Sequence, residues 1–373
     1  MILPEYIRRT IAESGLDVSA FEALGQRLAN GDDLIAANRV LGRVEAPEAD
    51  SWLDFSETEA EYTAWLEGGS KAIQSGALGL VILNGGMATR FGNVVKGTVD
   101  VAAGLSFLGL KIRDALRAAA SVGGEPPIII LMNSKATHED TLKHLADNAF
   151  FGYPQNRIWS FLQCWAVRFK PDGSLFLNEE GEASFYGPGH GDVVFGLKDS
   201  GLLERFLGAG GRHLLLSNVD NAVARVEPAL FGLHLAQGAA VTVEVVDRFP
   251  GDQGGAPYRV DGHLQIIEGF RLAADAQLDE VPVFNTNTFW LDAAALAGPA
   301  ELTWFAVPKR VDGEEVIQFE RLVGELTSFT DSAFVKVARL GESSRFIPVK
   351  TPADLDMSRG AILRGQGVVE TEL

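Results

Sequence analysis

The chain has 373 residues, enough for two ordinary domains or for one large α/β domain with extensions. Acidic residues outnumber basic ones by 50 to 32, and the net charge of −18 repels nucleic acids and acidic membrane surfaces. The single cysteine, Cys164, excludes an intramolecular disulfide and a multi-thiolate metal site, and its apolar neighbours predict a buried thiol. Because neither a membrane-length apolar run nor a secretory signal is visible, we expect a cytoplasmic protein.

The first 70 residues carry apolar side chains at helical spacing, for example Ile7, Ile11 and Leu16, and they predict an N-terminal helical segment over residues 1–70 without a strong strand. From about Ala77 onward, short apolar strands alternate with helical stretches. The predicted strands are Leu80–Leu83, Ile128–Met132, His213–Ser217 and Ala240–Val246. This alternation predicts a mostly parallel sheet with helices on both faces, in one α/β domain over residues 71–360 followed by a tail over 361–373.

A glycine-rich turn with two cations follows the first of these strands. It comprises Leu83, Asn84, Gly85, Gly86, Met87, Ala88, Thr89 and Arg90, with Lys96 a few residues later. Glycines let backbone N–H groups approach phosphate oxygens, so the turn indicates an anion site at the end of a buried strand. Its spacing matches neither the dinucleotide fingerprint nor the P-loop. The alternative is a structural turn in which Arg90 and Lys96 are solvated charges.

Two further turns predict β-hairpins, one over Val167–Phe176 and one over Tyr258–Ile267. Between them, the strand that begins at His213 ends in Ser217-Asn218-Val219-Asp220-Asn221. A carboxylate at the end of a central strand faces the ligand crevice of an open sheet, which makes Asp220 the best candidate for an Mg²⁺ ligand. An Asx turn or a helix N-cap is the structural alternative.

Two polar segments could read the hydroxyl groups of a ligand. His190 lies in a turn with three glycines and a proline, and Asn285 and Asn287 alternate along a predicted strand over Val283–Leu291, with their amides on one face. A merely structural histidine and an edge strand with solvated amides are the alternatives. Lys350, near the C-terminal end, adds another cation.

The chain has no G-x-S-x-G elbow, no HExxH and no cysteine pair. A glycine loop, cations, one metal carboxylate and hydroxyl-reading amides instead describe direct phosphoryl or nucleotidyl transfer. Positioning and charge stabilisation supply most of the catalysis in such reactions.

The chain resembles the UTP–glucose-1-phosphate uridylyltransferase (UDP-glucose pyrophosphorylase) family from about Ala77 to Leu355. The resemblance depends on the order of several motifs rather than on any one of them. The motifs are Leu83–Arg90, Leu131-Met132-Asn133-Ser134, Gly187-Pro188-Gly189-His190-Gly191-Asp192, Ser217–Asn221, Asn285-Thr286-Asn287, Val316–Glu320 and Arg345–Lys350.

The resemblance implies a Rossmann-like, GT-A-like nucleotidyltransferase fold with a mixed, mostly parallel sheet flanked by helices. It implies nucleotide contacts at Leu83, Asn84, Gly85, Gly86, Thr89, Met132, Gln163 and Gly189, with Gln163 reading the uracil. It also implies sugar contacts at His190, Asn218, Asn285 and Glu320. Arg90, Lys96 and Lys350 would be catalytic, and Asp220 would bind the metal, Mg²⁺.

The implied reaction joins UTP and glucose 1-phosphate into UDP-glucose and pyrophosphate, by attack of the sugar phosphate on the α-phosphorus. Nucleic acids and membranes are not expected as partners. The chain departs from the family at Ala88, where the family usually has glycine, and at Arg248, where it tends to carry lysine. It also leaves no room after Lys350 for the C-terminal β-helix domain of the eukaryotic members.

Two other functions compete with this interpretation. One is a pyrophosphorylase for UDP-N-acetylglucosamine or for a broad set of UDP-sugars, which the Gly-His-Gly and Asn-Thr-Asn segments disfavour. The other, motivated by Ala88, is a non-catalytic regulator that binds nucleotide sugars. The simultaneous presence of Asp220, Lys96 and Lys350 disfavours a protein without catalysis.

Overall fold

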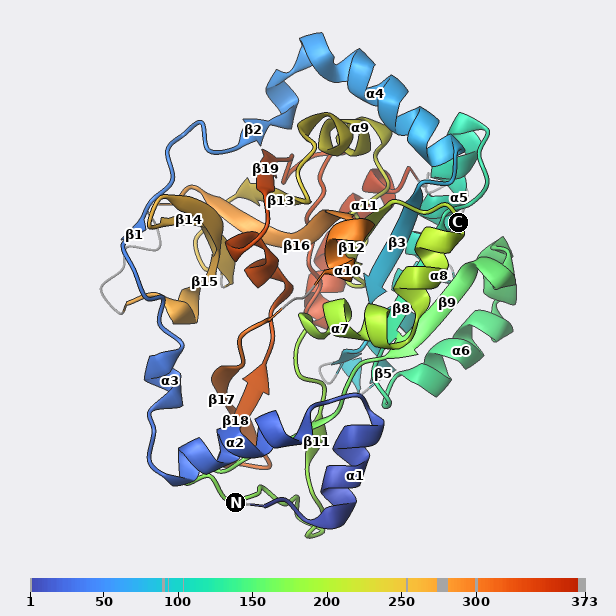
Figure 1. The fold of residues 1–373 in the computed structure, drawn as a ribbon. Coiled ribbons are helices and arrows are strands. Elements are labelled where there is room, and N and C mark those ends of the chain that lie inside the picture. The colour runs from blue at the N-terminus through green and yellow to red at the C-terminus, as the bar shows by residue number, and fades with distance from the viewer. Residues whose placement is uncertain are drawn as a thin grey trace.

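The computed structural model describes residues 2–88, 91–92, 94–102, 104–252, 254–273, 281–298 and 301–367. At its centre lies an eight-stranded sheet (Figure 1). In spatial order its strands are β2 (Leu53–Asp54), β19 (Ser332–Lys336), β13 (Val241–Asp247), β16 (Val283–Asp292), β12 (His213–Asn218), β3 (Leu78–Leu83), β8 (Ile128–Asn133) and β9 (Ile158–Leu162). All neighbours are parallel except β16, which is antiparallel to β12 and β13. The expected mixed, mostly parallel sheet is confirmed.

Helices cover both faces of this sheet, and alternate side chains of each central strand enter two different cores. From β3, Leu80 and Ile82 enter the first core, whereas Val81 and Leu83 enter the second. The first core includes α4 (Glu59–Gln74), α5 (Phe107–Val122), α9 (Pro228–Gln237) and α11 (Pro352–Gly365). The second includes α7 (Asp192–Asp199), α8 (Leu202–Gly208), α10 (Ala293–Ala297), β14 (Gly255–Val260) and β15 (His263–Glu268). Because both faces are covered, the central strands read as continuous apolar runs.

The N-terminal helices α1 (Glu5–Glu13), α2 (Val18–Ala29) and α3 (Leu34–Ala37) build a third core, at the lower edge of the molecule in Figure 1. They pack there against β10 (Ala166–Val167) and the hairpin of β17 (Phe305–Val311) and β18 (Glu314–Glu320). The predicted helices are present in this region. It also supplies two short strands that were not predicted, since β1 (Val44–Glu45) pairs with β14 and β2 joins the large sheet. The division at residues 70 and 360 stays a prediction.

Helix ends follow capping chemistry. The Ser106 hydroxyl accepts a hydrogen bond from the Gly109 N–H at the start of α5, and Gly123 ends this helix in the left-handed conformation. Similarly, α9 begins with Pro228 and ends at Gly238, which has φ of 65°.

Among the described residues, no helix is both long and apolar enough to cross a membrane.

The remaining elements are short and lie in the connections. They are α6 (His138–Asp147), the strands β4 (Met87–Ala88), β5 (Val94–Val95), β6 (Asp100–Ala102), β7 (Leu105–Ser106) and β11 (Phe185–Tyr186), and the 3₁₀ turns Phe55–Glu57, Lys96–Thr98, Ala149–Gly152, Gln155–Arg157, Gly269–Arg271 and Val323–Ser328. The predicted hairpin at 258–267 is confirmed as β14 and β15. In the hairpin at 167–176, Phe169 bridges Leu175 around the predicted turn.

Cys164 is buried as predicted, and burial raises the pKa of its thiol to about 12.

A histidine pair, in which His234 is buried and His213 half-buried, joins β12 to α9 at the end of β12 away from Asp220. His213 Nδ1 lies 3.1 Å from His234 Nε2, and His234 Nδ1 lies 2.9 Å from Thr242 Oγ1. Burial lowers the pKa of both rings, that of His234 to about 3. Below the unfolded-state pKa of about 6.5 the unfolded chain therefore binds more protons, so the pair makes the fold less stable as the pH falls toward 3.

We expect His234→Gln to weaken this pH dependence. Between pH 7.5 and 5.5, the free energy of unfolding should fall by about 1 kcal/mol more in the parent protein than in the variant. Urea unfolding at the two pH values measures the difference. An equal fall in both proteins would contradict the assigned pKa shift.

Candidate functional site

Two adjoining cavities open at the carboxyl ends of the central strands. The first, about 350 Å³, is lined by Leu83, Gly85, Gly86, Lys96, Met132, Gln163, Gly187, Gly189, His190, Asn218, Val219 and Asp220. The second, about 270 Å³, is lined by His190, Asn218, Asp220, Gly251, Asp252, Gly254, Gly255, Glu268, Phe284, Asn285, Thr286, Asn287, Phe346, Pro348 and Lys350. His190, Asn218 and Asp220 belong to both, so the cavities form one bipartite site.

Parallel strands bring the residues of the first cavity together. Leu83 ends β3, Met132 lies one residue before the end of β8, and Asn218 ends β12. These three strands are consecutive in the sheet, so their carboxyl ends and the loops that follow meet at one edge. This is the crevice in which open α/β sheets bind ligands.

Gln163, directly after β9, fits closely between two glycines. A Cβ on Gly85 would lie 2.3 Å from Gln163 Oε1, and a Cβ on Gly187 would lie 2.2 Å from its Nε2. The side chain is 7% exposed and lines the first cavity. Any larger residue at either glycine position would displace this amide.

Three predicted nucleotide-contact or catalytic residues are seen in neither cavity. Asn84 is completely buried, and its Nδ2 donates to Asn133 Oδ1 and to Thr141 Oγ1, so its side chain ties β3 to β8 and α6 instead of lining the cavity. Thr89 and Arg90 lie outside the described residues. Their roles stay predictions.

Lys96 and Asp220 are the oppositely charged residues that line the first cavity. Lys96 Nζ lies 3.9 Å from Asp220 Oδ2, donates to the carbonyl oxygen of Val349, and lies 4.6 Å from the centre of the Phe91 ring. Burial raises the pKa of Asp220, and the charge of Lys96 is the strongest effect that opposes this rise. The side chain of Asp220 is still 27% exposed, so a ligand can reach it.

Lys350 lines the second cavity from the segment before α11. Its side chain is exposed, but its backbone is fixed, because the N–H groups of Lys350 and Thr351 both donate to the carboxylate of Asp354. Thr351 in turn caps Asp354 N–H, which completes a capping box. The lysine therefore projects from the rigid start of a helix.

His190 is oriented by the backbone of a neighbouring turn. The Val323 N–H donates to His190 Nδ1 at 3.1 Å, and burial lowers the pKa of the ring to about 4. The ring is therefore neutral at pH 7, and its proton lies on Nε2, which is a hydrogen-bond donor. Gly189, with φ of 89°, packs so closely on Arg321 that a Cβ would lie 2.5 Å from the Arg321 carbonyl oxygen.

The amides of the second cavity differ from the predicted alternating strand. Asn287 has φ of 56°, and the register of β16 against β13 shifts between Glu244 and Val245. This bulge turns the Asn287 amide toward Asn218, whose Oδ1 accepts a hydrogen bond from Asn287 Nδ2 at 2.9 Å. Asn285 lines the cavity as expected of a sugar-binding amide.

The second cavity includes two carboxylates that the sequence reasoning missed, Asp252 and Glu268, and lacks one that it predicted. Glu268, at the end of β15, lines the cavity, and burial raises its pKa to about 7. The signal that could have found it is a carboxylate that directly follows the apolar pair Ile266-Ile267. Glu320 lines neither cavity, and its Oε1 lies 3.3 Å from Lys309 Nζ. A sugar contact of Glu320 stays a prediction.

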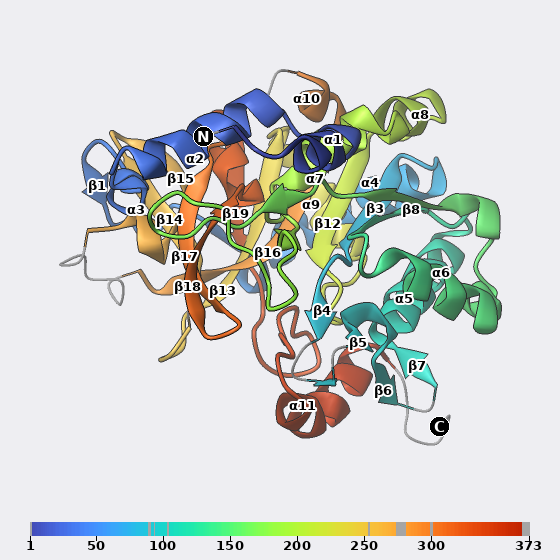
Figure 2. The ribbon, with the colours of Figure 1, turned by 90° about the horizontal axis from the view of Figure 1, so that it is seen from below.

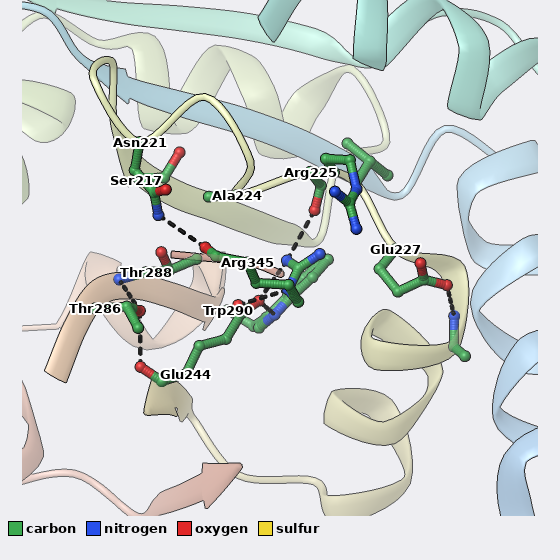
Figure 3. A network of polar contacts seen from close by, with 12 residues as sticks. Ser217, Asn221, Ala224, Arg225, Glu227, Glu244, Thr286, Thr288, Trp290 and Arg345 are labelled. Atoms are coloured by element: carbon green, nitrogen blue, oxygen red, sulfur yellow. Dashed lines mark hydrogen bonds and ion pairs between the residues drawn. The ribbon is translucent and has the colours of Figure 1, made fainter. Parts of the chain in front are cut away.

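A buried polar network lies behind the charged residues (Figure 3). Arg345 Nε and Nη2 donate to the two carboxylate oxygens of Glu244 at 2.7 and 2.6 Å, and Glu244 also accepts from Trp290 Nε1. Lys111 Nζ donates to Ser217 Oγ and to the carbonyl oxygen of Ala224, which holds both ends of the loop that carries Asp220. Burial lowers the pKa of Lys111 to about 7.

The donor set of the site suits an ion that completes its shell with phosphates and water. No group of three or more His, Cys, Asp or Glu side chains gathers as a ligand set within the described ranges, and Asp220 is the carboxylate shared by both cavities. Mg²⁺ is usually bound by one or two carboxylates together with substrate phosphates. The exposed carboxylate of Asp220 fits that mode, whereas a site made only of protein ligands does not.

Known proteins match this chain over most of its length. The sequence profile of the family described as UTP–glucose-1-phosphate uridylyltransferase matches residues 27–366. A UTP–glucose-1-phosphate uridylyltransferase of Solanum tuberosum is 30% identical over 289 residues, covering 73% of this chain and 59% of the relative. That of Encephalitozoon cuniculi is 30% identical over 292 residues, covering 74% and 57%. The chain thus spans less than two thirds of the length of these curated relatives.

Solved structures share the fold at lower sequence identity. A UDP-glucose phosphorylase of Trypanosoma brucei superposes with a TM-score of 0.75 at 23% identity, covering 94% of this chain and 77% of the other. A uridine diphosphate N-acetylglucosamine pyrophosphorylase of the same organism gives 0.76 at 19%, covering 95% and 79%. Since relatives named for both sugars match equally well, the fold does not choose between them.

Proposed function

Since the chain belongs to the UTP–glucose-1-phosphate uridylyltransferase family, we propose that it forms UDP-glucose and pyrophosphate from UTP and glucose 1-phosphate. The observation that carries this proposal is the pair of cavities that share His190, Asn218 and Asp220. The first cavity has glycines and the amide of Gln163, which suit a nucleotide. The second has amides and carboxylates, which suit sugar hydroxyls. Ligands in the two cavities would meet at Asp220.

In this reaction an oxygen of the sugar phosphate forms a bond to the α-phosphorus of UTP. The bond from that phosphorus to the bridging oxygen breaks, and pyrophosphate leaves with the electron pair. Lys96 and Lys350 approach Asp220 from opposite cavities, so their ammonium groups would offset the charge that builds on the transferring group. Arg90 is proposed to assist from the sequence motif alone. No covalent intermediate with the protein is needed.

Asp220 is the residue that would hold Mg²⁺. When bound there, the ion would neutralise phosphate charge and bring the two substrates into one geometry. The protein contributes a carboxylate held by a loop that Lys111 fixes at both ends.

Recognition of the two substrates is assigned to the two cavities. Leu83, Gly85, Gly86, Met132 and Gly189 would surround the nucleotide, with Gln163 against the uracil edge. His190, Asn218 and Asn285 would contact the sugar hydroxyls. Glu268 lines the same cavity, so we add it to this group.

The partners in this proposal are the four small molecules of the reaction. The net charge of −18 argues against a nucleic-acid partner. We also propose a cytoplasmic location, which the single buried cysteine supports because the fold has no disulfide to form.

Release of pyrophosphate from UTP, measured separately with glucose 1-phosphate and with N-acetylglucosamine 1-phosphate, tests the proposal. We expect substantially faster turnover with glucose 1-phosphate. Faster turnover with the N-acetylated sugar would replace the proposed substrate, and binding of UDP-glucose without turnover of either would identify a regulator.

Gln163→Ala tests the assignment of the uracil side. The amide lies between Gly85 and Gly187 and presents both a donor and an acceptor, so its loss should lower the preference for UTP over CTP by about 10-fold. Competition between the two nucleotides in one assay measures this ratio. Gln265→Ala, at a buried amide outside both cavities, is the control that should keep the preference. An unchanged ratio in Gln163→Ala would refute the assignment.

A further inference from the structure

The segment that carries Lys350 belongs to no strand of a sheet. Residues 345–350 lie outside every helix and strand, and α11 begins only at Pro352. Phe346, Pro348 and Lys350 line the second cavity, whereas Arg345 and Val349, on the alternate positions, are buried. Buried backbone N–H and C=O groups of such a segment need partners that a neighbouring strand would otherwise supply.

Asn221 supplies two of these partners. Its Nδ2 donates to the carbonyl oxygen of Arg345 at 3.0 Å, and its Oδ1 accepts from the Ile347 N–H at 3.1 Å. The side chain is 1% exposed, and the first of these bonds is visible in Figure 3. An amide side chain can act in this way because it presents a donor and an acceptor side by side, as a peptide group does.

The residues that this contact joins lie close in the sequence to Asp220 and Lys350. Asn221 follows Asp220 directly, and Ile347 lies three residues before Lys350. One buried side chain thus connects the loop of the metal carboxylate to the segment of the lysine. The two hydrogen bonds therefore restrain the segment that leads to Lys350 relative to the loop of Asp220.

We propose that Asn221 is a positioning residue, which holds Lys350 in place against Asp220 through its two hydrogen bonds to residues 345 and 347. The inference depends on the proposed function, because it concerns the rate of that reaction. Asn221 lines neither cavity, so it acts through Lys350 rather than on a substrate.

Asn38 offers a matched control. It is buried to a similar degree, and its amide makes the same pair of bonds, donating to the carbonyl oxygen of Ala306 at 2.7 Å and accepting from the Ala306 N–H at 3.0 Å. It connects α3 to β17 and lines neither cavity. Asn38→Ala therefore removes equivalent bonds without touching the lysine segment.

The test is a double-mutant cycle on pyrophosphate release. Asn221→Ala should lower kcat by about 10- to 100-fold, because small displacements of a charged group are costly, with less than about a 3-fold change in the KM for UTP. In a Lys350→Met background the same change should lower kcat by less than about 3-fold, whereas in a Gln163→Ala background the full loss should remain. Asn38→Ala should keep the parental kcat.

Hydrogen exchange gives a second measurement that does not need activity. Peptides over residues 345–350 should exchange faster in Asn221→Ala and unchanged in Asn38→Ala. Asn221→Leu, which keeps more side-chain volume, replaces the alanine variant if that one does not fold.

The outcomes separate the two proposals. A parent protein that does not turn over UTP and glucose 1-phosphate refutes the proposed function. If the parent is active, an equal loss of kcat in the parent and Lys350→Met backgrounds, or unchanged exchange over 345–350, overturns only the role of Asn221. A parental kcat in Lys350→Met overturns the roles of both Asn221 and Lys350 but not the proposed reaction.

Discussion

Asp220→Ala and Lys96→Ala are each expected to lower kcat by at least about 100-fold, which corresponds to about 2.7 kcal/mol of transition-state stabilisation. Lys96 Nζ and Asp220 Oδ2 lie 3.9 Å apart in the first cavity. The carboxylate would hold the metal and the ammonium would neutralise phosphate charge. Neither has a described neighbour of the same charge in the first cavity that could take over its role. Initial rates at saturating UTP and glucose 1-phosphate measure the loss.

The control for this pair is another aspartate–lysine contact of similar exposure. Asp54 Oδ2 lies 2.8 Å from Lys336 Nζ, where β2 joins β19 at the edge of the sheet, and both lie outside the two cavities. Asp54→Ala should keep kcat within about 2-fold, because this pair lines neither cavity. Near-parental rates in both Asp220→Ala and Lys96→Ala would refute their assigned roles.

The strands could be predicted from the sequence because burial on both faces leaves a continuous apolar run. The runs of β3, β8 and β12 are of this kind, whereas β13 carries Thr242 and Glu244 between its valines. All four predicted strands are confirmed. The direction of β16 could not be predicted, since side-chain alternation is the same in parallel and antiparallel strands. The bulge at Asn287 could not be predicted from the sequence either, because it depends on the pairing of β16 with β13.

A place in the cavity could be predicted where a residue lies at or shortly after a strand end, as Leu83, Met132 and Asp220 do, because carboxyl ends of neighbouring parallel strands meet. Asn84 shows the limit of this rule. It follows the same strand, but its Nδ2 donates to Asn133 and Thr141 behind the cavity. Side-chain direction after a strand depends on partners from distant segments, which one sequence does not reveal.

The network behind the site was missed for the same reason. Lys111 contacts residues more than 100 positions away, and Arg345 is 101 positions from Glu244. In the sequence these are ordinary charged residues, which most often lie on the surface. Only the fold shows that Arg345 and Glu244 have buried side chains, 4% and 0% exposed.

Glu244→Ala is the substitution from which we expect the largest loss of stability, about 3 to 5 kcal/mol in the free energy of unfolding. It would leave the Arg345 guanidinium buried without its bidentate partner and would remove the acceptor of Trp290 Nε1–H. A buried charge without a partner keeps its full desolvation cost, whereas the intact pair offsets most of it. Guanidinium chloride unfolding, followed by tryptophan fluorescence, measures the change.

Two controls distinguish this mechanism from a general effect of losing a carboxylate. Glu13→Ala removes the exposed pair with Arg9, whose side chains are 64% and 78% exposed, and should cost less than about 1 kcal/mol. The double variant Glu244→Met with Arg345→Met removes both charges, so it should be more stable than Glu244→Ala despite carrying more substitutions. If Glu244→Ala instead unfolds within about 1 kcal/mol of the parent, water must reach the guanidinium in solution. The segment that leads from Arg345 to Lys350 would then be held mainly by Asn221 and by the cap of α11.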